Sequence, residues 1–426
     1  MKRNQILLIL VAVILTIASI RLADDTQNFI RSLPVLLAWI AVLLRIVPSL
    51  SKPIVIIRRI PVLLWLIDLI AFVMIIAVWI VVYQPAVGIA LSGAEYFWLF
   101  GGFYGMIALS TVGTMQQSSP IGWWASPLIT ITTIVLIIIG LELGLRYVWV
   151  MSDNFQFSKM HSNWSRLYWN PLNTESYRDY HPALNDERMQ IIVAGDSLAA
   201  GYGVDSIDDT FPHLLDNLLG DDSTVNIVAQ PGWGISTALG ALENYPTKPD
   251  IVILSHYIND IAEGSAGQQY SQPFPTIRLE PTENQRWWVE NFYIANFLYY
   301  RVFLYTQYDS VGLYNGWLRG AYENPTVWDA YQAEMQAWID WTAANDAELV
   351  VIVWSNLLAI DEWRDVTDPV VSYFEAQDIP VVDMGDALQG ENPSKLTVNL
   401  FDAHPSEYSH QVAAEHLYRV ITGGNQ

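Results

Sequence analysis

Five apolar stretches fill the first 151 residues, and each is close to the 20 or so residues that a helix needs to cross a bilayer. Lipid cannot hydrogen-bond to a backbone, so such a segment must satisfy its own polar groups, as a helix does. Residues 1–151 are therefore predicted to form a transmembrane region of about five helices. The stretches are residues 6–22, 33–50, 61–83, 86–112 and 123–151.

Charge around these stretches predicts their orientation. The first stretch resembles a signal peptide, but its best cleavage site, near Ala18, is weak, and we interpret it as a retained span. The amino terminus and loop 51–60 are basic, whereas loop 23–29 carries two aspartates. Basic loops stay in the cytoplasm, so the amino terminus is expected inside and residues 152–426 outside. The predicted location is the cell membrane, with an extracytoplasmic carboxyl-terminal domain.

The two halves of the chain also differ in net charge. Residues 1–151 hold nine basic and five acidic side chains, a net charge of +4. The whole chain has a net charge of −22, which leaves −26 on residues 152–426. A nucleic-acid-binding protein needs a positive surface, so nucleic acid is excluded as a partner. The chain has no cysteine and can form no disulfide.

After a polar connector, residues 152–187, short apolar runs alternate with helical patterns in residues 188–426. This alternation predicts an α/β domain, a three-layer α/β/α arrangement around a parallel sheet. For the aromatic-rich insertion, residues 261–325, three interpretations stay open: a packed cap, a stacking surface for sugar rings, or an edge at the membrane interface. Predicted strands are 189–194, 224–229, 250–255, 348–354 and 380–383, and predicted helices are 210–219, 236–243, 327–344, 365–376 and 405–420.

Residues 188–204, RMQIIVAGDSLAAGYGV, predict a buried strand, a tight turn and the start of a helix. The turn puts Ser197 at the carboxyl end of a strand, where active sites of parallel sheets lie. Other strand-following loops bring Gly232, Asn259 and the pair Asp402 and His404 to the same edge. Acyl transfer needs this set: a nucleophile, a base, an orienting carboxylate and donors for an oxyanion. The plain alternative is that Ser197 only caps a helix.

The spacing of these residues resembles the SGNH (GDSL-type) hydrolase family, whose four sequence blocks centre on Ser, Gly, Asn and His. Residues 195–198 are literally Gly-Asp-Ser-Leu, and the other three block residues match Gly232, Asn259 and His404. The resemblance implies a flavodoxin-like fold, with Ser197 as nucleophile and His404 as general base and then acid. It also implies an oxyanion hole formed by the backbone N–H groups of Ser197 and Gly232 and the side-chain amide of Asn259.

Two positions depart from the family pattern. The family places an aspartate three residues before the histidine, but Phe401 stands there and Asp402 lies two before His404. Either Asp402 orients the imidazole, or a backbone carbonyl does and the site is a Ser–His dyad. Tyr257 also stands where a glycine is common. An α/β-hydrolase would need Gly-x-Ser-x-Gly, and Ala199 breaks that pattern.

These features predict a membrane-anchored serine esterase that removes acetyl or other short acyl groups from an envelope or extracellular glycan through an acyl-enzyme. Two alternatives stay open, an O-acyltransferase using the same site on a cell-envelope polysaccharide and a non-catalytic glycan-binding module. The expected partners are the lipid bilayer and an acylated carbohydrate or other ester. No His, Asp or Glu residues have metal-ligand spacing, so neither a metal nor another cofactor is expected.

Overall fold

The computed structural model describes residues 134, 137–146, 149–154, 158–180, 187–263, 267–275, 280–306 and 308–423. The chain divides into two compact units, Met1–Val148 and Trp149–Gln426. Four predicted spans and most of the fifth lie outside the described residues. Within those residues no helix combines the length and the apolar character needed to cross a membrane.

A five-stranded parallel sheet forms the centre of the second unit. Its strand order, β2-β1-β3-β4-β5, places β1 between β2 and β3. The sheet confirms the predicted α/β class, and this order is one of the two common doubly wound arrangements. The strands are β1 (Met189–Gly195), β2 (Ser223–Ala229), β3 (Ile251–Tyr257), β4 (Glu348–Trp354) and β5 (Val381–Asp383).

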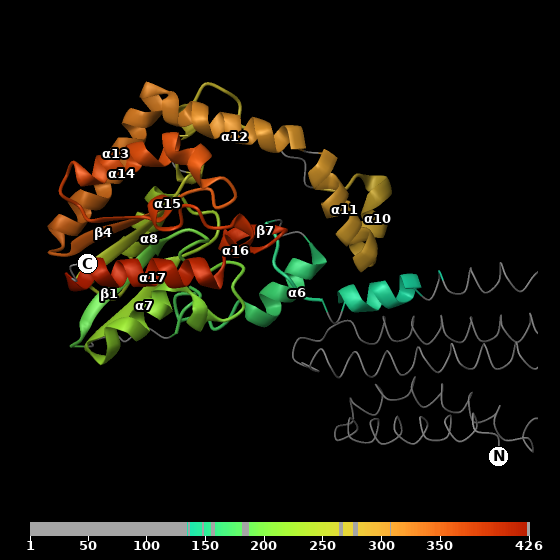
Figure 1. Cartoon of the computed structure of the whole chain (residues 1–426), viewed down its shortest axis with the longest axis horizontal. Helices are drawn as coiled ribbons and strands as arrows, with labels where there is room; N and C mark the ends of the chain where they lie inside the picture. The colour runs from blue at the N-terminus through green and yellow to red at the C-terminus, as the bar shows by residue number, and fades with distance from the viewer. Residues whose placement is uncertain are drawn as a thin grey trace, which may run out of the picture. The chain divides into compact units, whose positions relative to one another are not determined.

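Helices cover both faces of this sheet (Figure 1). Successive side chains of a strand point to opposite faces, and in β1 Ile192 packs in one apolar cluster and Ile191 in the other. Because both faces are buried, the strands are almost continuously apolar instead of alternating. The first face is covered by α8 (Ile235–Glu243), α13 (Pro325–Ala344) and α14 (Arg364–Glu375), and the second by α7 (Phe211–Leu219) and α17 (Glu407–Thr422).

The last predicted helix begins two residues later than expected, because the chain first forms a small antiparallel hairpin. Its strands are β6 (Thr397–Asn399) and β7 (Asp402–Pro405), and Thr397 pairs with Pro405. Ser406 then caps α17 by accepting a hydrogen bond from the backbone N–H of Ser409 (3.3 Å). The hairpin was not predicted, and it carries both Asp402 and His404.

The connector and the insertion contain more helix than their polar or aromatic sequences suggest. The connector includes α6 (Lys159–Tyr168), capped by Ser158, whose hydroxyl accepts from His161 N (3.0 Å). In the insertion, Tyr293, Tyr300 and Trp317 are buried as a packed cap requires, but Trp287 and Trp288 are 56% and 57% exposed. The insertion forms α9 (Asp260–Glu263), α10 (Glu283–Asn291), α11 (Tyr293–Thr306) and α12 (Tyr308–Glu323).

Two fully buried histidines make the stability of the fold sensitive to acid. Burial lowers the pKa of His256 and of His410 to about 3, whereas an unfolded histidine titrates near 6.5. Between these pKa values the unfolded chain binds more protons than the folded chain. The contribution of the two histidines to the free energy of unfolding is therefore fully present above pH ~6.5 and is lost as the pH falls. By pH 5 each histidine should lower the free energy of unfolding by about 2 kcal/mol.

The variant His410→Asn tests this pH dependence. Asparagine can still accept the hydrogen bond that His410 Nδ1 accepts from Phe211 N (3.1 Å), but it does not titrate. We expect the stability lost between pH 7.5 and pH 5 to be about 2 kcal/mol smaller in this variant, measured by urea unfolding with tryptophan fluorescence. An unchanged loss would show that His410 does not contribute to acid sensitivity.

Candidate active site

The turn after β1 fixes the position of Ser197. A Cβ at Gly195 would lie 2.8 Å from the carbonyl oxygen of Ser255 on β3, so only glycine fits there. The carboxylate of Asp196 accepts a hydrogen bond from Leu198 N (2.9 Å), and the carbonyl of Ser197 accepts one from Tyr202 N (2.9 Å). These bonds hold Ser197 at the end of the strand, where it is 8% exposed.

The predicted helix directly after this turn is wrong. Residues 197–203 form consecutive turns, and the next α-helix, α7, begins only at Phe211. Gly201 and Gly203 have φ values of +65° and +90°, a conformation that ends any helix. A side chain at Gly203 would also collide with Val398 and with the carboxylate of Asp402, so the turn and the β6–β7 hairpin approach each other closely here.

Ser197, His404 and Asp402 form one hydrogen-bonded chain. His404 Nε2 lies 3.0 Å from Ser197 Oγ, and His404 Nδ1 lies 2.5 Å from Asp402 Oδ1. Asp402 also accepts the backbone N–H of His404 (3.1 Å) and is completely buried, whereas the side chain of His404 is 18% exposed. Burial raises the pKa of Asp402, but the charge of His404 and these hydrogen bonds outweigh it, and the net pKa is lowered. The carboxylate is therefore ionised beside the imidazole.

The β-strand conformation explains why an aspartate two residues before the histidine reaches it. In a strand, residues i and i+2 point to the same side, and Asp402 and His404 are both on β7. Phe401 belongs to the preceding turn, where its ring lies over the guanidinium of Arg301, 3.4 Å from ring centroid to Cζ. The structure thus places a carboxylate, not a backbone carbonyl, against Nδ1 of His404.

The remaining predicted site residues follow the two strands that flank β1. Gly232 lies in the turn after β2 with φ +82°, which requires glycine, and a Cβ there would meet nothing within 4 Å. Asn259 lies in the turn after β3, fixed by the hydrogen bonds Tyr257 N to Asp260 Oδ2 and Ala262 N to Asn259 O (both 2.8 Å). Since all three strands are parallel, these turns and Ser197 lie at one edge of the sheet.

Two buried residues next to the site were not identified from the sequence. The ring of Tyr202 packs on the imidazole of His404, with centroids 4.3 Å apart. The guanidinium of Arg178 donates to the carbonyls of Gly201, Val204 (2.7 Å) and Tyr168 (2.9 Å), so it ties the turn at residues 197–203 to α6. Neither had a sequence signal, since Arg178 comes from the connector and binds carbonyls, and Tyr202 is an aromatic residue between two glycines.

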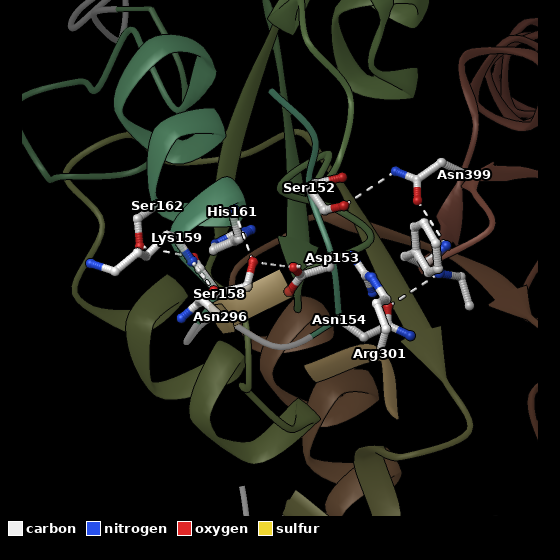
Figure 2. A network of polar contacts seen from close by, with 12 residues as sticks. Ser152, Asp153, Asn154, Ser158, Lys159, His161, Ser162, Asn296, Arg301 and Asn399 are labelled. Atoms are coloured by element: carbon white, nitrogen blue, oxygen red, sulfur yellow. Dashed lines mark hydrogen bonds and ion pairs between the residues drawn. The ribbon is translucent and has the colours of Figure 1, made fainter. Parts of the chain in front are cut away.

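The connector contacts the hairpin directly, as Figure 2 shows. Asn399 Nδ2 donates to Ser152 O (3.2 Å), and Asn154 N donates to Phe401 O (3.2 Å). Asn154 Oδ1 accepts from Ala403 N (3.1 Å), the residue between Asp402 and His404. The connector therefore lies along β7, the strand that carries Asp402 and His404. Among the residues that the structure describes, no three His, Asp or Glu side chains cluster as metal ligands.

No family model and no curated protein matches the chain. A similar solved structure is the lipase/acylhydrolase from Enterococcus faecalis, at 13% identity and TM-score 0.34, over 55% of this chain and 96% of that one. Another is a member of the lipolytic protein G-D-S-L family from Veillonella parvula DSM 2008, at 13% and 0.31, over 55% and 98%. A third is a carbohydrate acetylesterase family member from Sinorhizobium meliloti, at 13% and 0.30, over 55% and 98%.

Proposed function

We propose that this chain is a serine-dependent esterase of the SGNH (GDSL-type) family. The observation that carries the proposal is the chain of contacts Ser197 Oγ, His404 Nε2, His404 Nδ1 and Asp402 Oδ1, at 3.0 and 2.5 Å. A base within hydrogen-bond reach of a hydroxyl, itself oriented by a carboxylate, activates that hydroxyl as a nucleophile. The four family blocks around Ser197, Gly232, Asn259 and His404 support the same assignment.

The geometry supports a two-step acyl transfer. Ser197 Oγ attacks the acyl carbon while His404 Nε2 takes its proton, and the ionised Asp402 stabilises the imidazolium. His404 then gives this proton to the leaving alcohol, and an acyl-enzyme forms on Ser197. In the second step His404 deprotonates water, which attacks the acyl carbon, and the proton returns to Ser197 as the carboxylic acid leaves.

The oxyanion of each tetrahedral intermediate needs donors on the other side of the acyl carbon. We assign this role to the backbone N–H groups of Ser197 and Gly232 and to the amide of Asn259, whose turns lie at the same sheet edge. The backbone at Gly232 is open to close approach because glycine leaves no side chain over it. Removing one such donor costs about 10²- to 10³-fold in kcat.

The proposed substrate is a short acyl ester, acetyl above all, on an envelope or extracellular glycan, and the proposed location is the outer side of the cell membrane. The location is supported by the five apolar stretches and the basic loops, and the glycan follows from that location. The full-length protein should hydrolyse 4-nitrophenyl acetate faster than the palmitate ester, and should release acetate from acetylated polysaccharide. No turnover of any ester would contradict the esterase proposal.

The absence of cysteine from the chain allows a clean test of the proposed topology. We expect Leu218→Cys, at a side chain 45% exposed on α7, to react with a membrane-impermeant maleimide on intact cells. Ser51→Cys, in the basic loop, should react only after the membrane is opened. The reverse pattern would contradict the predicted orientation without affecting the chemistry of Ser197.

The same acyl-enzyme could pass its acyl group to a sugar hydroxyl instead of water, and the predicted multi-span region favours this second candidate because it could position an acyl donor. Adding an acceptor polysaccharide to the ester-hydrolysis assay distinguishes the esterase from the O-acyltransferase. An esterase releases acid at an unchanged rate, whereas an O-acyltransferase acylates the polysaccharide and releases less acid. Binding of polysaccharide without turnover of either kind would favour a non-catalytic binding module.

A further inference from the structure

The geometry points to Tyr202 as a positioning residue. It holds the imidazole of His404 against both the nucleophile turn, residues 197–203, and the connector. This inference rests on the proposed function, because it concerns the base of the same site. Tyr202 is 4% exposed and lies five residues after Ser197. It joins three parts of the site that the sequence keeps far apart, as its separate contacts show.

The first two contacts of Tyr202 involve the site itself. Its backbone N–H donates to the carbonyl of Ser197 (2.9 Å), so a displacement of Tyr202 displaces the nucleophile turn. Its ring lies against the His404 ring at 4.3 Å between centroids, with 38° between the planes. The imidazole is thus held on one side by an aromatic face and at its two nitrogens by Ser197 and Asp402.

The third contact fixes Tyr202 to the connector. Its hydroxyl donates to the backbone carbonyl of Asp153 (2.9 Å) and lies 3.2 Å from Nδ1 of His161, whose ring stacks on the tyrosine at 5.2 Å. Burial lowers the pKa of His161 to about 4, so this partner is neutral at physiological pH. The ring of Tyr202 therefore cannot rotate away from His404 without breaking bonds to the connector.

Asp153 is itself held firmly, so it is a fixed support for Tyr202. Its carboxylate is completely buried, accepts a hydrogen bond from Ser158 Oγ and lies 3.7 Å from Arg301 Nη2 on α11 (Figure 2). Its two chain neighbours hydrogen-bond to the hairpin: the carbonyl of Ser152 accepts from Asn399 Nδ2, and Asn154 bonds to the backbone of Phe401 and Ala403. The connector thus holds His404 twice, through Tyr202 and through the backbone on each side of Asp402.

A base held in this way needs little reorganisation when it takes the serine proton. Loosening it lowers the fraction of molecules with Nε2 aligned to Oγ, and misplacements near 1 Å cost up to about 10²-fold in rate. The support acts on the base and not on substrate contacts, so kcat should fall while KM stays unchanged. A merely structural tyrosine would instead lower the melting temperature, Tm, and leave kcat of the folded protein intact.

The test uses two variants of the full-length protein. Tyr202→Phe keeps the ring on His404 and removes only the hydroxyl, and Asn154→Ala removes an exposed side chain whose Oδ1 accepts the hydrogen bond from Ala403 N. Each should lower kcat, and the rate of fluorophosphonate reaction with Ser197, about tenfold with KM within twofold. Tyr202→Leu, which also removes the ring, should lower both rates further.

Tyr373→Phe is the matched control, since that half-buried hydroxyl also makes two hydrogen bonds (3.1 Å each), to Gln332 O and Gln336 Oε1 on α13. It should leave both rates unchanged. Independently of activity, hydrogen exchange of the peptide covering β7 should rise in Tyr202→Phe and Asn154→Ala and not in Tyr373→Phe. Unchanged rates in both variants would overturn the positioning role of Tyr202, and unchanged exchange in both would overturn the claim that the connector holds the hairpin.

The outcome is distinguishable from failure of the proposed function. If the wild-type protein neither hydrolyses esters nor reacts with the fluorophosphonate, the esterase assignment fails, and the exchange result alone decides whether the connector holds the hairpin. If the wild type reacts at Ser197 but the two variants react equally fast, the esterase assignment stands and the positioning role of Tyr202 is wrong.

Discussion

Ser197→Ala should lower kcat for ester hydrolysis by about 10⁴-fold or more, with little change in stability. The hydroxyl of Ser197 is the nucleophile in the proposed reaction, and no neighbouring group can replace the bond that it forms with the acyl carbon. His404→Ala should cause a loss of similar size, because an unactivated hydroxyl is a poor nucleophile. Steady-state hydrolysis of 4-nitrophenyl acetate by the full-length protein measures both.

Because Ser197 and His404 act as a unit, the double variant with both residues changed to alanine should be as active as either single variant. Ser355→Ala is the matched control, a buried serine that follows strand β4 and whose hydroxyl points to Ile360 O (3.5 Å). It should keep nearly full activity. Retained activity in Ser197→Ala, or losses that simply multiply in the double variant, would contradict a shared role.

Asp402→Asn should lower kcat about 10⁴-fold and leave KM nearly unchanged. The carboxylate of Asp402 lies 2.5 Å from Nδ1 of His404 and is ionised, so it stabilises the imidazolium that forms when Ser197 loses its proton. A neutral amide provides no such charge, and its NH₂ group can leave the imidazole in the wrong tautomer.

The size of this loss decides between two descriptions of the base. A loss of less than tenfold would mean that Asp402 is dispensable and that Ser197 and His404 act as a dyad. Phe401→Ala is the control, since Phe401 occupies the position three before His404 and its ring contacts Arg301. Its effect on kcat should stay below tenfold, so a large loss from Phe401→Ala and none from Asp402→Asn would reverse the assignment.

The sheet was predictable because the strands β1 to β4 are buried on both faces. Burial makes residues 191–194 of β1 a continuous apolar run, and the run ends abruptly where the chain turns into the crevice. The hairpin β6–β7 was not predictable in this way. Its strands have three and four residues, too short for any periodic pattern, and their pairing depends on contacts with the distant connector.

The residues of the candidate site were predictable where their position depends only on the strand that precedes them in the sequence. Ser197, Gly232 and Asn259 each follow a strand, and parallel strands bring such turns together. Whether Asp402 could reach His404 depended on the backbone conformation, because a spacing of two brings side chains together only in a strand. Tyr202 and Arg178 act through contacts with backbone carbonyls and a ring from other segments, which sequence spacing does not encode.

The most direct test of the proposed mechanism is mass spectrometry of the full-length protein after reaction with a fluorophosphonate. We expect one adduct per chain, on the peptide containing Ser197, formed quickly in the wild type and in Ser355→Ala, and more slowly in His404→Ala. The variant Ser197→Ala should form none. An adduct on another serine, or equal labelling of the wild type and Ser197→Ala, would contradict the assignment of Ser197 as the nucleophile.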